Sequence, residues 1–200
     1  MSKLKTIINE LEEHIPFTAS ASLIAIIIVA LIFYFNQNFL LEISKSFETF
    51  HGLHIFASAI VSTGIFYKYK KKIFSAILVG ILSSIIIGSL SDVILPYAGS
   101  LVLGLKPEFH LPIIENFLII FGAGLIGCIF GLLTGLTKLP HFLHIFLSTV
   151  ASLFYIIQYS TFTLISFIGI FFVLFIAVII PCCTSDIVLP ILFLRGKHKH

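Results

Sequence analysis

The chain has 200 residues, of which 58% are hydrophobic and 10% are charged, and its formal net charge is +3. A soluble globular domain has about 45–50% apolar and about 25% charged residues, so this composition leaves too little polar surface to face water. It excludes a soluble domain and predicts an all-α integral membrane protein embedded in the lipid bilayer. The basic residues are dispersed along the chain, which argues against a nucleic-acid partner.

The first 17 residues predict an amphipathic helix at the membrane surface. Lys3 and Lys5 are followed by acidic residues between positions 10 and 13, and not by the apolar core and cleavage site of a secretory signal peptide. Six apolar segments follow, at residues 18–35, 50–67, 73–96, 115–137, 141–158 and 162–194. A membrane span needs about 20 apolar residues, and its backbone must satisfy its own hydrogen bonds, so each segment is predicted to be a transmembrane helix.

The basic residues divide unequally between the two faces of a six-span arrangement. Only Lys45 and Lys106 fall on the face opposite the N-terminus. The N-terminal face has Lys3, Lys5, Lys68, Lys70, Lys71, Lys72, Lys138, Arg195, Lys197 and Lys199. Cytoplasmic loops carry an excess of Lys and Arg. The pattern therefore predicts a protein of the cytoplasmic membrane with both termini inside, including a cytoplasmic tail at 195–200.

The sequence contains an internal repeat of two words. HGLHIFASAIVS at 51–62 aligns with HFLHIFLSTVAS at 141–152, with seven identities in twelve positions, and SDVILP at 91–96 aligns with SDIVLP at 185–190. This duplication predicts two three-helix repeats, 18–106 and 107–194. Because three is an odd number of spans, the second repeat enters the membrane from the opposite face. Inverted-topology repeats of this kind are typical of secondary transporters.

The third helix of each repeat is predicted to be broken. Residues 73–105 and 162–194 are too long for one straight crossing. Pro96, Pro181 and Pro190 are the expected break points, since proline removes a helical hydrogen bond. The only two aspartates of the chain, Asp92 and Asp186, lie in these helices, and a buried acid in a membrane marks a functional site by default.

The repeated words predict a metal or proton site. Histidines three residues apart share a helix face, and imidazole with thiolate favours transition-metal ions such as Zn, Fe, Cu or Mn. The candidate metal ligands are Glu48, His51, His54, Asp92, His141, His144, Cys182, Cys183 and Asp186. The serines spaced along the same faces form a candidate pathway: Ser58, Ser62, Ser91, Ser148, Ser152 and Ser185.

The placement of these residues in depth leaves two arrangements open. Antiparallel pairing of neighbouring helices puts His54 near Asp92 toward the outer side, and His144 near Asp186 toward the inner side. The motifs then form either two half-sites or two gates around one central site. Structural roles also remain open, because the histidines could lie at helix ends, the aspartates could cap helices, and the cysteines could be small packing residues.

These features together favour a small membrane transporter or channel for a cation, either a transition-metal ion or protons. Two alternatives remain: a membrane-embedded metal-dependent enzyme, in which a bound ion activates water, and a b-type haem redox protein with histidine axial ligands. An enzyme is the less favoured interpretation, because the histidine pairs have no obvious general base beside them. Assembly as a homo-oligomer is compatible with the sequence.

Overall fold

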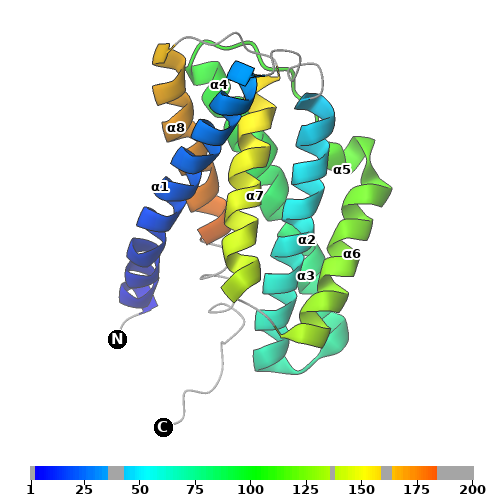
Figure 1. Ribbon diagram of the computed structural model, residues 1–200. Coiled ribbons are helices and arrows are strands. Elements are labelled where there is room, and N and C mark those ends of the chain that lie inside the picture. Colours follow the sequence, from blue (N-terminus) through cyan, green and yellow to red (C-terminus); the bar gives the residue numbers. More distant parts are fainter. Residues whose placement is uncertain (1–2, 36–42, 136–137, 159–163, 184–200) are drawn as a thin grey trace.

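Figure 1 shows the computed structural model, which describes residues 3–35, 43–135, 138–158 and 164–183. Over these residues all regular structure is helical, so the prediction of an all-α chain is confirmed for them. Three helices are long and apolar enough to cross a membrane, and they cover Lys45–Lys70, Ile73–Val102 and Phe117–Thr134. Shorter apolar helices cover Thr18–Ile32, Leu143–Ile157 and Ile168–Cys182. These helices indicate a membrane protein.

The helices follow one another along the chain with short connections. In order they are α1 (Lys3–Phe35), α2 (Ile43–Lys70), α3 (Ile73–Ser89), the π-helical turn η2 (Leu90–Ile94), α4 (Leu95–Val102), α5 (Pro112–Glu115), α6 (Phe117–Thr134), α7 (Lys138–Ile157), α8 (Leu164–Val178) and the π-helical turn η3 (Ile179–Cys183). Each of the six predicted apolar segments overlaps at least one of these helices. Helix α1 continues without interruption through Pro16, and the surface location of residues 1–17 stays a prediction.

Helix α2 lies at the centre of the packing. It contacts α3, α6 and α7, while α7 also contacts α1 and α8 on its other side (Figure 1). In the view of Figure 1, α2 descends and α7 ascends, so the two helices that carry the repeated HxLHIF word are antiparallel neighbours. Residues that are about ninety positions apart in the sequence are therefore brought together in the interior.

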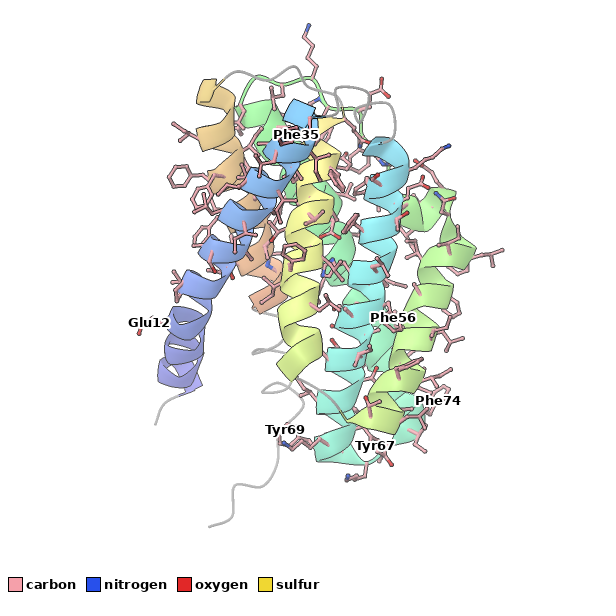
Figure 2. All side chains as sticks on the ribbon, in the orientation of Figure 1. Glu12, Phe35, Phe56, Tyr67, Tyr69 and Phe74 are labelled. Carbon is pink, nitrogen blue, oxygen red and sulfur yellow. The ribbon has the colours of Figure 1, made fainter. Side chains whose placement is uncertain are left out.

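The two ends of the bundle differ in charge. The turn at 71–72 joins α2 to α3 at the lower end, where α7 also begins at Lys138 (Figure 1). Tyr67 and Tyr69 lie at this end, and Lys71 Nζ is 5.1 Å from the centre of the Tyr67 ring (Figure 2). Lys45 and Lys106 belong to the upper end. Tyrosine at a helix end beside basic residues is typical of a membrane interface.

The predicted break at Pro96 is wrong. Residues 73–102 form one continuous helical path in which η2 replaces a break, and Ile94 and Leu95 both have right-handed helical angles. A π turn lets a membrane helix accept proline, because it redistributes the backbone hydrogen bonds that proline removes. In the predicted third helix of the second repeat, Pro181 lies inside η3, and Pro190 is outside the described residues.

Two glycines allow α6 to pack closely against α2. A Cβ atom at Gly127 would lie 2.3 Å from the Phe56 carbonyl oxygen, and one at Gly131 would lie 2.6 Å from the Ile60 carbonyl oxygen. Both obstacles are backbone atoms of α2, which cannot rotate away. Small residues at such positions let membrane helices approach each other.

Replacing Gly127 by alanine is therefore expected to lower the free energy of unfolding by about 1–3 kcal/mol, as overpacking of a tight interior does. The matched control is Gly122→Ala in the same helix, where an added Cβ would meet no atom within 4 Å. There the better helix propensity of alanine is expected to leave stability unchanged or slightly higher. Unfolding in detergent measures both variants, and equal stability of the two would contradict this account of the α2–α6 contact.

Candidate functional site

Asp92 is the centre of a polar cluster inside the helix bundle. It lies in η2, and its side chain is completely buried. Both carboxylate oxygens are bonded to other side chains: Oδ2 contacts two histidines and Oδ1 contacts two serines. An ionised carboxylate has about four acceptor positions, so this one is saturated. These contacts replace the helix-capping role that the sequence left open for Asp92.

The two histidines of the first repeated word bind the same oxygen. His51 Nδ1 and His54 Nδ1 lie 2.8 Å and 2.7 Å from Asp92 Oδ2, and both rings are completely buried. Their spacing of three residues on α2 places them on the helix face toward η2. When Asp92 is ionised it can only accept, so each imidazole donates from Nδ1. The second ring nitrogen, Nε2, is then the atom of each histidine through which a proton can arrive or leave.

The second repeat supplies the other half of the cluster. Ser148 on α7 donates to Asp92 Oδ1 at 2.7 Å, as does Ser91 next to the acid. The His144 ring stacks on that of His54, with centroids 5.8 Å apart and planes 8° apart. Cys182 in η3 places its Sγ 3.8 Å from His54 Nε2 and 3.6 Å from Ser148 Oγ. Side chains from both repeats therefore meet at one site.

This meeting changes the expected placement of His144. The sequence put His144 at a different depth from His54, beside Asp186. The structure instead places the two histidine rings in contact, because α2 and α7 cross where their repeated words are side by side. The described residues thus form one cluster with side chains from both halves of the chain. Asp186 and Ser185 lie outside the described residues, as do the side chains of His141 and Cys183.

Because of the π turn, a backbone carbonyl next to Asp92 accepts a hydrogen bond from a side chain of α7. Leu95 N–H bonds to the Leu90 carbonyl, five residues earlier, and so does not reach the Ser91 carbonyl. The next donor in a π pattern would be the nitrogen of Pro96, which has no hydrogen. Ser152 Oγ supplies the missing donor, at 3.0 Å from the Ser91 oxygen.

Replacing Ser152 by alanine is expected to lower the free energy of unfolding by about 1–3 kcal/mol, because it leaves a buried carbonyl without its donor. Ser100→Ala is the matched control on the neighbouring α4. Ser100 is also completely buried, but its Oγ has no hydrogen-bond partner among the described residues, so its removal is expected to be neutral or slightly stabilising. Thermal unfolding of both variants in detergent tests this difference. A larger loss for Ser100→Ala would rule out the proposed role of Ser152.

Hydroxyl groups continue from the cluster toward the lower end of the bundle. Ser58 is buried one turn beyond His54 on α2. Ser62 is one turn further, with its Oγ 3.4 Å from Ser83 Oγ on α3. We call Ser58, Ser62 and Ser83 the hydroxyl track. Ser83 was not among the predicted pathway residues, although a serine on the helix that follows α2 could have been considered as one.

One predicted ligand lies away from the cluster. Glu48 is exposed, and its Oε1 accepts a hydrogen bond from Asn116 Nδ2 at 3.0 Å. Glu48 and His51 are three residues apart, as His51 and His54 are, but Glu48 is exposed and bonded to Asn116, whereas His51 is buried and bonded to Asp92. Glu48 is therefore not a member of the site.

The described residues do not form a ready-made metal site. Within residues 3–35, 43–135, 138–158 and 164–183, no three His, Cys, Asp or Glu side chains are placed to hold one metal ion. At Asp92 both histidines direct Nδ1 at the same carboxylate oxygen, so the acid and the imidazoles contact one another through hydrogen bonds.

A second group, missed by sequence analysis, lies next to His51 on the upper side. Phe47 stacks on the His51 ring at 5.6 Å, and it also contacts His110 and Tyr155 edge-on at 5.2 Å and 5.4 Å. Because Phe47 precedes His51 by one helical turn, the contact between them could have been predicted from the sequence. The contact of Phe47 with Tyr155, which lies far away in the chain, could not.

Comparison of the chain with models of protein families, with curated proteins and with solved structures finds no match. The class of protein therefore follows from the structure itself: a helical chain with long apolar helices and a buried acid–histidine cluster.

Proposed function

We propose that the protein is a small membrane transporter or channel for a cation, and that the cation is the proton. The observation that carries this proposal is the contact of His51 and His54 with one oxygen of the buried Asp92. Ionisable groups inside a membrane mark ion pathways and proton relays by default. No buried acid is needed merely to hold apolar helices together.

The charge of the cluster supports a proton as the cargo. An ionised Asp92 with two neutral histidines is a net negative charge in an apolar interior, which is costly. One added proton on either imidazole turns the cluster into a neutral ion pair without moving any heavy atom. The cluster therefore has two protonation states of the same geometry, as a relay requires.

Polar groups along α2 support a route through the bundle. His51, His54, Ser58 and Ser62 occupy one side of the helix at intervals of three or four residues. From His51 to Ser62 this stretch is about 16 Å long at 1.5 Å per residue. That length covers about half of the roughly 30 Å hydrocarbon core of a bilayer. The hydroxyl track would conduct toward the lower end.

The proposal includes six spans arranged as two inverted three-helix repeats in the cytoplasmic membrane, with both termini inside. The antiparallel course of α2 and α7 and the separation of basic residues between the two ends support this arrangement. A cluster with side chains from both halves of the chain supports this arrangement, because inverted-repeat transporters bind their substrates near the interface of the repeats.

Proteoliposomes that contain a trapped pH-sensitive dye test the function directly. A pH difference across the membrane is expected to dissipate faster than in liposomes with Asp92→Asn protein. Equal rates would reject proton transport.

A transition-metal ion is the second candidate cargo. The observation in its favour is that histidine ligands of metals usually donate their other ring nitrogen to a carboxylate, as His54 does here with Cys182 near its Nε2. Metal uptake by the same proteoliposomes separates the two cargoes. Elemental analysis and an absorbance spectrum of the purified protein test the enzyme and haem alternatives.

A further inference from the structure

Three aromatic rings lie next to the cluster on the side of His51, toward the upper end of the bundle. Phe47, His110 and Tyr155, which we call the aromatic layer, contact one another in every pair, since His110 also stacks on Tyr155 at 5.2 Å. Phe47 and Tyr155 are completely buried, while His110 is partly exposed in the loop between α4 and α5. Tyr155 Oη donates to the Glu108 carbonyl at 3.0 Å, which fastens this loop to α7.

The His51 ring, on which Phe47 stacks, contains the ring nitrogen of the Asp92–His51–His54 group that has no partner among the described residues. His51 Nε2 is buried and has no hydrogen-bond partner among the described residues. A buried polar atom of this kind calls for a specific explanation, such as a catalytic role or a bound water or ion. Because Nδ1 of the same ring donates to Asp92, Nε2 of neutral His51 is a base that faces the interior.

We infer that His51 Nε2 is the site at which a water molecule or hydronium ion delivers the proton from the upper side, and that Phe47 is the gate over this site. The inference rests on the proposed proton transport and adds its access route. Phe47 stacks on His51, and it also touches the partly exposed His110. Displacement of its ring opens a path from His110 to His51.

The test measures access to position 51 with a membrane-impermeant, cationic thiol reagent, applied separately to each side of the membrane. The labelled protein carries His51→Cys, and the parent with its native cysteines gives the background. Labelling from the side of Lys45 and Lys106 is expected to be slow with Phe47 in place and several-fold faster with Phe47→Ala. The matched control is Phe50→Ala, which removes a ring from the same helix that contacts Phe154 at 5.3 Å instead of His51.

Equal labelling in the Phe47→Ala and Phe50→Ala backgrounds would overturn the gate, as would fast labelling with both rings present. Phe47→Leu provides the same comparison if the alanine variant fails to fold. Labelling does not depend on transport, because His51→Cys lacks the imidazole. Proton flux is measured in parallel with His51 intact, and Phe47→Ala is expected to raise it. Absence of flux in every variant rejects the proposed function, while the labelling ratio still decides the gate.

Discussion

Asp92→Asn is expected to abolish proton transport and to lower the free energy of unfolding by about 3–5 kcal/mol, the usual cost of removing one partner from a buried charged pair. The amide oxygen of asparagine has two lone pairs, whereas four donors converge on the Asp92 carboxylate. At least two buried donors would lose their acceptor. A neutral amide also cannot exchange a proton at neutral pH.

Proton flux and thermal unfolding should be measured on the same preparations of this variant. Ser100→Ala, a change at another buried polar residue of the same helical path that makes no hydrogen bond to the cluster, is the control for handling and folding. If Asp92 only capped a helix, asparagine would cost about 1 kcal/mol or less, because it caps nearly as well. A fully active and stable Asp92→Asn protein would therefore eliminate the acid as the proton carrier.

His54→Ala is the second change with a large expected effect, since the His54 side chain contacts residues from both halves of the chain. Its Nδ1 binds Asp92, its Nε2 lies near Cys182, and its ring stacks on His144. Loss of one hydrogen bond to a charged group is expected to cost about 1.5–3 kcal/mol of unfolding free energy. Transport is expected to fall to the level of empty liposomes, because the relay then has no imidazole between Asp92 and the hydroxyl track.

The neighbouring Leu53 provides the control for His54. It is 45% exposed on the outward face of α2, so Leu53→Ala is expected to change the unfolding free energy by no more than about 0.5 kcal/mol and to leave transport intact. Transport at the original rate in His54→Ala would show that His51 alone serves the acid. Equal damage from both substitutions would mean that α2 as a whole, and not the imidazole, had been disturbed.

The sequence by itself determined the helical class and the membrane setting, and it identified the central residues. Apolar runs of span length require helices, since lipid cannot satisfy an open backbone. The spacing of His51 and His54 in a repeated word, with Asp92 as one of only two aspartates, was sufficient to predict that the three act together. These are properties of composition and of local helical geometry.

Only the tertiary structure decided which residues from the second half of the chain join the cluster around Asp92. Ser148, His144 and Cys182 meet the first repeat because α7 packs antiparallel against α2, and such a crossing depends on the shapes of whole helix faces. The π turn in place of a break at Pro96 could not be predicted from the sequence either, because it depends on a hydrogen bond from Ser152 on α7 to the Ser91 carbonyl. Helical periodicity relates residues a few positions apart, whereas these contacts join residues that are far apart in the chain.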